Sequence, residues 1–242
     1  VEEILRHYNL IVPEIQREYV WGYNTHNIVD VFLNDIVEGK STKDINMKTK
    51  MENLQKMIDS PDIPADAKDA LQIAIQQIND VSLEINIGFL YSYRPNYSEG
   101  SKDRDLYLID GQQRFTTLWL ISVVLKEHLV AYTQLDTKQG KRQRISFSIR
   151  PQVTKFFEKI CEDLPASLPE AMQLEDALQE IRAYFDNYYD KKETLDKKAL
   201  SEFILTKVQL ILTAVPKHTD LNKLFEVINN RGVQLQHHEI LK

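Results

Sequence analysis

The sequence predicts an α+β protein in which helix is the majority and a small sheet forms the rest. Short stretches around Ile85 and Ile145 alternate apolar and polar residues, as half-buried strands do. Elsewhere apolar residues recur at helical spacing, and the pattern is mostly helical after Arg150-Pro151. The chain has 242 residues and is 43% hydrophobic, so it can bury a sizeable core.

The N-terminal elements follow from these two periodicities. We expect a helix over residues 1–7, a strand over 10–12, and a helix over about 25–38 with one apolar face. Two further helices, 47–59 and 65–80, are separated by Ser60-Pro-Asp-Ile-Pro64, and Pro64 suits a first helical turn. They predict an inserted helical hairpin within residues 41–84.

The remaining elements complete one elaborated domain over residues 1–242. Strands are expected at 85–89, 107–109 and 145–149, with a strongly apolar helix at 115–125. Residues 1–150 would form the sheet-containing core, 151–207 a helical annex, and 208–242 a closing strand and a capped helix from Asp220. A stripe in the annex predicts core packing and not base stacking; it comprises Ala177, Ile181, Tyr184, Phe185 and Tyr188.

The most informative stretch is the polar run from Asp110 to Arg114, which lies between the 107–109 strand and the 115–125 helix. Gly111 permits a tight turn at this strand-to-helix corner. The first N–H groups of the helix lack intrahelical partners there, so they can hold an anion. Arg114 adds a planar cation suited to phosphate oxygens. A structural interpretation stays open: Asp110 as an N-cap, Gln112 and Gln113 as partners of loop backbone, and Arg114 in an ion pair.

Two other segments accompany this run. Val12-Pro-Glu-Ile-Gln-Arg-Glu-Tyr-Val-Trp21 places Gln16 and Arg17 ahead of a predicted helix, and the segment from Leu224 to Lys242 contains Asn229-Asn-Arg-Gly232 between two predicted helices. In this order, with the Asp-Gly-Gln-Gln-Arg signature, the three segments resemble the N-terminal domain of GmrSD-type, modification-dependent restriction endonucleases. That family looks like a distant branch of the ParB/sulfiredoxin superfamily, whose fold is a small mixed sheet with a majority of helix.

The resemblance implies a module that binds and hydrolyses nucleoside triphosphate. Its partner would be an HNH-type nuclease domain or subunit, through which DNA is contacted, in defence against modified phage DNA. No nuclease segment is recognisable in these residues. Because the chain starts at Val1 and stops just after a motif that opens a helix, we expect it to be part of a longer protein.

In ParB-like domains the pocket forms between an N-terminal arginine box and the glycine turn, so here it would join Gln16 and Arg17 to the Asp110–Arg114 run. Arg17 and Arg114 would hold phosphates beside the Gly111 and Gln112 amides. Gln112 or Gln113 would orient the attacking water, with Gln113 the one we favour, and Asp110 would coordinate Mg²⁺. The pocket could be completed by Asn229, Asn230 and Arg231, although these residues equally suit an ordinary helix C-terminal turn.

Charge argues against a protein that mainly coats DNA. The chain carries 30 basic and 36 acidic residues, a net charge of −6, whereas non-specific binding needs clustered cations. One basic strip, comprising Lys138, Lys141, Arg142 and Arg144, could contact DNA or be a solvated loop. Two alternatives therefore remain: a ParB-like DNA-binding or nuclease module, and a catalytically silent nucleotide sensor.

Other features place limits on function. The one cysteine, Cys161, excludes an internal disulfide and fits a structural thiol in a reducing compartment. His237 and His238 are adjacent, so their side chains diverge on a helix and cannot chelate one metal as an i, i+4 pair would. No run approaches the ~20 apolar residues of a membrane helix. We expect a cytoplasmic protein without membrane contact that could form homo-oligomers.

Overall fold

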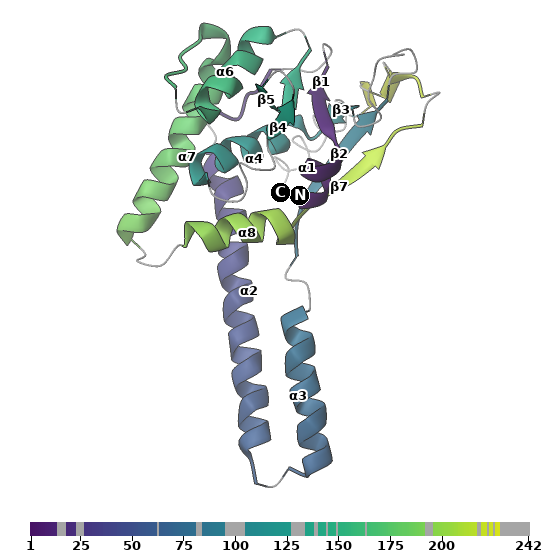
Figure 1. Ribbon diagram of the computed structural model, residues 1–242, viewed down its shortest axis with the longest axis vertical. Coiled ribbons are helices and arrows are strands. Elements are labelled where there is room, and N and C mark those ends of the chain that lie inside the picture. The colour runs from purple at the N-terminus through teal and green to yellow at the C-terminus, as the bar shows by residue number, and fades with distance from the viewer. Residues whose placement is uncertain are drawn as a thin grey trace, which may run out of the picture.

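The structure is a computed structural model, and it confirms the α+β class (Figure 1). It describes residues 1–13, 18–22, 27–61, 63–80, 84–94, 105–126, 134–137, 140–143, 145–148, 150–162, 164–191, 196–216, 219–221, 223–224 and 226–227.

A five-stranded mixed sheet forms the centre of the protein, in the order β6-β1-β3-β2-β7. β1 runs parallel to both β3 and β6, β2 is antiparallel to β3, and β7 is parallel to β2. The strands are β1 (Asn9–Val12), β2 (Ile85–Tyr93), β3 (Asp105–Asp110), β6 (Ile145–Phe147) and β7 (Val208–Ala214). The strand expected over 145–149 is therefore confirmed as far as Phe147, and Ile149 lies outside the described residues.

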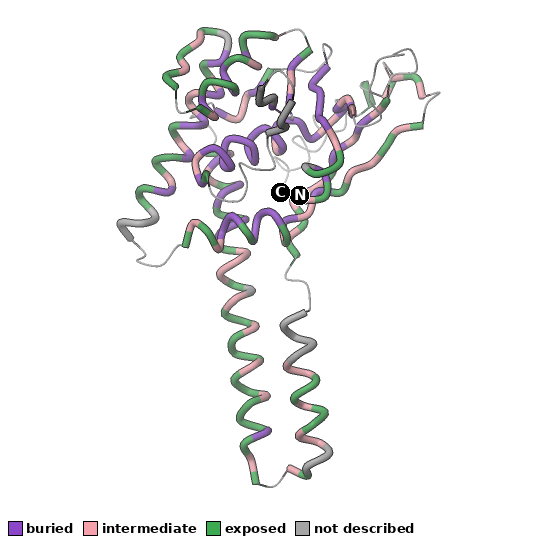
Figure 2. The backbone as a smooth tube through the Cα atoms, in the orientation of Figure 1, coloured by how far each residue is buried: buried purple, intermediate pink, exposed green. Residues whose placement is uncertain are grey.

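The helices gather beside this sheet, and α4 (Gln112–Leu125) occupies the middle of the core (Figure 2). Twelve of its fourteen residues are buried, which explains why its sequence is apolar on all sides. The other helices are α1 (Glu2–His7), α2 (Ile28–Asp59), α3 (Ala65–Asp80), α6 (Pro151–Cys161), α7 (Met172–Lys191) and α8 (Lys197–Lys207), with the short 3₁₀ turn η1 (Pro169–Ala171) leading into α7. Within the described part of the chain, none of these helices is both long and apolar enough to cross a bilayer.

The break expected between residues 38 and 47 is wrong, because α2 continues as one helix of 32 residues. Gly39 is a weak helix former, yet it lies where a Cβ would be 2.5 Å from Ile85 Cδ1, so its small size permits close packing against β2. Lys40 forms an i, i+4 ion pair with Asp44 in the next turn. Both contacts lie in the stretch where the break was expected, and α2 and α3 form the predicted hairpin (Figure 1).

The annex packs as the apolar stripe predicts. Ala177, Ile181 and Phe185 of α7 are fully buried, and the half-buried Tyr184 donates a hydrogen bond to Asn34 Oδ1 at 2.8 Å. The side chain of Tyr188 lies outside the described residues. Cys161 is half-buried, with its thiol 3.5 Å from Gln143 Oε1. The described part of the stripe is therefore core packing, as expected, and the prediction for Tyr188 stays untested.

A separate two-stranded hairpin, β4 (Gln134–Thr137) with β5 (Gly140–Gln143), carries part of the basic strip. Lys141 and Arg142 belong to β5, so the loop interpretation is wrong for these two residues. Lys138 and Arg144 lie outside the described residues, as do His237 and His238. After β7 in the chain, Asp220 Oδ1 accepts the Lys223 N–H at 3.2 Å, which agrees with the predicted cap.

Candidate functional site

The polar run forms a tight corner between β3 and α4, as the sequence predicts. Asp110 is the last residue of β3, and Gly111 is the N-cap of α4 with φ of 86°. A Cβ at Gly111 would lie 2.5 Å from Phe89 O and 2.6 Å from Leu90 Cδ2. Both the left-handed backbone and the close approach of β2 therefore require glycine here.

The N-terminus of α4 at this corner has no side-chain cap. The Gly111 carbonyl accepts the first helical hydrogen bond, from Phe115 N at 3.1 Å, and the half-buried Asp110 accepts the Gly111 N–H at 2.7 Å. The first N–H groups of a helix have no partner within the helix itself, and they lie at the positive end of the helix dipole. The corner therefore places the Asp110 carboxylate beside the positive end of the α4 dipole.

Arg114, in the first turn of α4, lies across the backbone of β2 at a glycine. Gly88 has φ of 115°, and a Cβ there would be 3.2 Å from the Arg114 Cζ atom. The β2–β7 register shifts between Asn86 and Phe89, and Asn86 Oδ1 accepts the Gly88 N–H at 2.8 Å. This bulge makes room for the guanidinium, which is half-exposed. Among the described residues, no ion pair or hydrogen bond is found for the Arg114 guanidinium.

A second bulge lies on the other side of the corner. Tyr91 pairs with Asp110 but the next residue, Ser92, pairs with Leu108, so Ile109 is an extra residue in β3. Bulges re-aim side chains and are common beside functional sites. The two irregularities set the direction of the chain into Asp110 and of Arg114 over β2.

Gln113 has a different environment from the one that a water-orienting residue needs. Its Oε1 accepts the Val20 N–H at 2.9 Å, and its Nε2 donates to the Glu18 carbonyl at 2.8 Å. The side chain is buried, and it binds the backbone on both sides of Tyr19 as a neighbouring strand would. Gln113 therefore fixes residues 18–20 against α4.

Further contacts hold what we call the clamped segment, Glu18 to Gly22. The Thr117 hydroxyl donates to the Gln113 carbonyl at 2.9 Å, so the Tyr19 hydroxyl is the donor in its 2.8 Å bond to Thr117 Oγ1. Burial raises the pKa of the Tyr19 phenol, which keeps this donor protonated. Gly22 lies so close to α7 that a Cβ would be 1.8 Å from the Gln173 carbonyl.

Trp21 of the clamped segment packs edge-on against Phe32 of α2 with ring centroids 5.5 Å apart, and it is half-buried. Both aromatic residues of the clamped segment, Trp21 and Tyr19, therefore pack against neighbouring helices. Gln112, on the first turn of α4, is also buried.

The other predicted site residues cannot be placed. Gln16 and Arg17 lie outside the described residues, as do Asn229, Asn230 and Arg231. The structure thus brings together Asp110, Gly111, Gln112, Gln113 and Arg114, and it ties them to the segment that follows Gln16 and Arg17 in the sequence.

A magnesium ion at this corner would need ligands besides the protein side chains. In the described part of the chain, no three His, Cys, Asp or Glu side chains are placed to hold a metal ion. Asp110 offers one half-buried carboxylate at the start of α4. Mg²⁺ in nucleotide sites is commonly held by one or two carboxylates together with substrate phosphates and water. The donor set therefore suits Mg²⁺ that arrives with a nucleotide, and not a protein-only metal centre.

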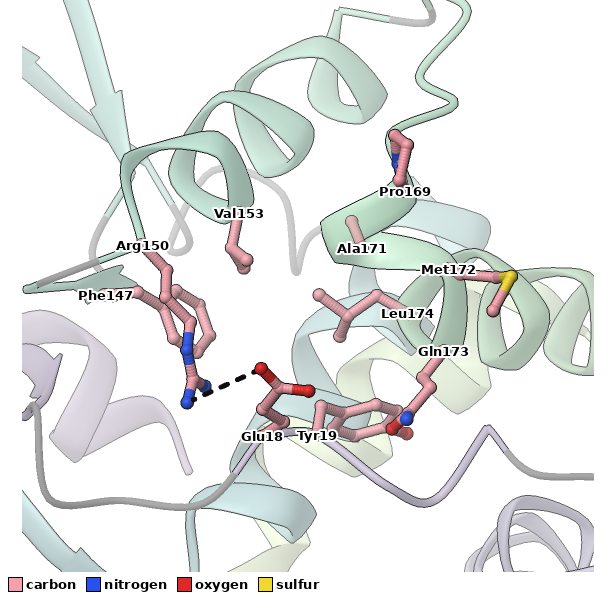
Figure 3. A pocket seen from close by; sticks show the side chains of 10 residues that line it. All are labelled: Glu18, Tyr19, Phe147, Arg150, Val153, Pro169, Ala171, Met172, Gln173 and Leu174. Carbon is pink, nitrogen blue, oxygen red and sulfur yellow. Dashed lines mark ion pairs between the residues drawn. The ribbon is translucent and has the colours of Figure 1, made fainter.

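Sequence reasoning missed a cleft that the clamped segment borders (Figure 3). Glu18 and Tyr19 form its floor, and the N-terminal ends of α6 and α7 form its walls. The Arg150-Pro151 pair marks the start of α6 in the sequence, but nothing in the pattern shows that α7 begins beside it.

The fold and the corner define an α+β domain with a polar strand-to-helix site. Comparison with known families identifies the family of this domain. The whole chain, residues 1–242, matches the family described as the GmrSD restriction endonuclease N-terminal domain, and it belongs to that family. The protein is therefore a component of a restriction system. A comparison with curated proteins finds no match. The wider kinship with ParB and sulfiredoxin stays a prediction.

Proposed function

We propose that this domain binds and hydrolyses a nucleoside triphosphate and thereby controls a separate HNH-type nuclease domain of the restriction system. The observation that carries the proposal is the Asp110–Arg114 corner. A helix N-terminus without a side-chain cap, a guanidinium held over a glycine bulge and a carboxylate lie within one turn of chain. A chain of phosphates with its Mg²⁺ is the ligand whose charges match all three groups.

Each residue of the corner has a role in this proposal. Arg114 and the backbone amides at the start of α4 bind phosphate oxygens, and Asp110 holds Mg²⁺ directly or through water. Mg²⁺, when bound, neutralises charge on the phosphates. In the reaction a water oxygen bonds to the terminal phosphorus as the bond to the bridging oxygen breaks, giving nucleoside diphosphate and phosphate. Preorganised positive charge at the corner stabilises the transition state.

Gln112 and Gln113 have different roles in this proposal. Both atoms of the Gln113 amide are already hydrogen-bonded to residues 18 and 20, which favours a positioning role. Gln112, which is also buried, is the other glutamine that we consider for orienting water, and our expectation from the sequence favoured Gln113. Gln16 and Arg17 extend the site in the proposal, because the clamped segment follows them directly, and Asn229, Asn230 and Arg231 complete it.

Control of a nuclease, and contact with DNA through it, fit the charge of the chain. The net charge is −6, so the domain offers no general attraction for DNA phosphates. A ParB-like DNA-binding role remains the second candidate, and it predicts a steep loss of DNA affinity with salt. A silent sensor is the third, and it predicts nucleotide binding without phosphate release.

A nucleotide panel tests the proposal. ATP, GTP, CTP and UTP are titrated with Mg²⁺, and binding and phosphate release are measured separately. Arg114→Ala should weaken binding about ten- to a hundredfold, since one charge-assisted contact contributes about 1.5–3 kcal/mol. Arg114→Lys should recover only part, because it keeps the charge but not the planar fork. The matched control is Arg182→Ala at an exposed position of α7.

The outcomes separate the candidates. Parental affinity in a folded Arg114→Ala protein would refute phosphate binding at the corner. Binding of a nucleotide without release of phosphate, in the presence of Mg²⁺, would establish the sensor in place of the enzyme. If hydrolysis occurs, Gln112→Ala should lower turnover far more than affinity, because a water-orienting group acts in the transition state.

A further inference from the structure

β7 is an edge strand of the sheet. The strand order ends with it, and among the described strands its one neighbour is β2 (Figure 1). β7 has seven residues, and none of them is charged or is a proline. Soluble proteins usually blunt such an edge with lysine, proline, a bulge or a covering segment, because an open edge pairs readily with another strand. The composition of β7 therefore favours pairing.

The backbone groups of β7 point alternately toward β2 and away from it. Directly after the strand, Val215 donates its N–H to the Ser92 carbonyl of β2 at 2.8 Å, so the odd-numbered residues face β2. The even-numbered residues face outward, and of these the Val208 carbonyl accepts a hydrogen bond from the Val1 nitrogen at 2.9 Å. For Leu210 and Leu212, no backbone partner on the outer side is found within the described part of the chain. Their N–H and C=O groups are therefore open to another strand.

Apolar side chains are exposed beside this edge. Ile211, the middle residue of β7, is 39% exposed, and Phe89, with which it pairs on β2, is 46% exposed. Tyr91 stacks on Phe89 with ring centroids 6.1 Å apart. Open backbone groups and exposed apolar side chains thus lie together at one margin of the sheet.

We propose that β7 pairs antiparallel with β7 of a second copy of this chain, about a two-fold axis at Ile211. This register uses the whole strand, because it sets Val208 opposite Ala214 of the partner subunit. Leu210 then faces Leu212 of the partner subunit, and each such pair exchanges two backbone hydrogen bonds, about four in all. The two Ile211 side chains meet as a non-hydrogen-bonded pair, which is the closer kind of cross-strand pair.

Three properties of the strand favour a second copy over another occupant. β7 is neutral, so self-pairing sets no like charges opposite each other, and the strand offers no charge that would select a basic or an acidic partner. A two-fold contact needs a self-complementary surface, which the central position of the exposed Ile211 provides. Lys207 before the strand and Pro216 after it disfavour pairing beyond its ends, so the register centred on Ile211 is preferred.

The dimer does not rest on nucleotide hydrolysis. It joins two sheets into one, and because the strand order is β3-β2-β7, the Asp110–Arg114 corner at the end of β3 lies two strands from the axis. About four backbone hydrogen bonds and one apolar contact make a small interface. The dimer should therefore be weak and its population should depend on protein concentration.

Sedimentation velocity over a range of protein concentrations tests the proposal, and amide hydrogen exchange at Leu210 and Leu212 reports on the strand itself. The parental protein should dimerise as its concentration rises, and the protection of both amides should rise with it. Ile211→Lys and Ile211→Glu should each weaken dimerisation roughly tenfold or more, because each sets like charges opposite each other in place of an apolar contact. An equimolar mixture of the two variants should form a heterodimer, which native mass spectrometry detects. The matched control is Ile73→Lys at an exposed position of α3.

A backbone variant tests the hydrogen bonds separately from the side chains. Ala214→Pro removes an outward N–H at an exposed position and leaves the bonds to β2 in place, so it should weaken dimerisation while circular dichroism shows the parental fold. The proposal is overturned if the parental protein stays monomeric, if these variants dimerise like the parent, or if the mixture gives no heterodimer. Protection of Leu210 and Leu212 that does not change with concentration would show that a segment of the same chain covers β7, and it would also overturn the proposal.

Discussion

Replacing Gln113 by alanine tests how the clamped segment is held on α4. The substitution removes two hydrogen bonds, from the Val20 N–H at 2.9 Å and to the Glu18 carbonyl at 2.8 Å. Each bond contributes a net ~1 kcal/mol, and the higher helix propensity of alanine offsets a few tenths. We therefore expect the free energy of unfolding to fall by about 2 kcal/mol. In a chain of this length that lowers the melting temperature by roughly 4–8 °C.

Thermal denaturation followed by circular dichroism measures the melting temperature. Amide hydrogen exchange at Val20 measures the local stability of the clamped segment. Gln179→Ala is the matched control, because Gln179 is exposed on α7. Gln113→Glu keeps an acceptor for Val20 but turns a carboxylate oxygen toward the Glu18 carbonyl, so it should not rescue stability. A melting temperature within about 1 °C of the parent, with unchanged exchange at Val20, would show that Gln113 does not hold the segment.

The remaining predictions concern Gly88, Trp21 and Glu180. Gly88→Ala should lower both stability and nucleotide affinity, since it strains a backbone at φ of 115° and displaces the Arg114 guanidinium. A variant that binds nucleotide like the parent would contradict the role of the Gly88 bulge in positioning Arg114. Trp21→Ala should lower the free energy of unfolding, measured with denaturant, by roughly 2 kcal/mol, about half the value for a fully buried ring. Loss of nucleotide affinity at parental stability would indicate that Trp21 stacks on a base instead. Burial, then Asp30 and Asp176, raise the pKa of Glu180, so the native state holds its proton more tightly than the unfolded state. The stability that the Glu180 carboxyl contributes is lost as pH rises through its raised pKa. Glu180→Gln should therefore raise the melting temperature at pH 7 more than at pH 4. An equal effect at both pH values would refute the raised pKa of Glu180.

The sequence correctly predicts the elements that are marked by the pattern of apolar residues within their own segment. The alternation at Ile85 and Ile145 and the all-round apolar run after Arg114 correctly indicate β2, β6 and α4. The predicted helical break near Gly39 is wrong. Gly39 packs closely against Ile85, some 46 residues away in the chain, and helix propensity takes no account of such a long-range contact.

The candidate site shows the same division. Gly111 and the order Asp-Gly-Gln-Gln-Arg are local, and the turn they predict is present. The bulge at Gly88 under Arg114 depends on the register of β2 against β7 and has no signal in the pattern. The role of Gln113 depends on the clamped segment, and the α6–α7 cleft depends on two helix starts that the chain places about twenty residues apart, so neither could be read in advance.

The unbroken α2 helix gives the protein a lever. Val29, Leu33, Ile36 and Val37 fix its first three turns in the core, Gly39 packs against β2, and the part beyond projects from the body of the protein with α3 (Figures 1 and 2). From Lys40 to Asp59 the helix extends about 29 Å. Phe32 of the same helix touches Trp21 of the clamped segment, so a force applied at the tip would reach that segment through this contact. A fluorophore or a tether placed at the hairpin tip would therefore report rotation of the core.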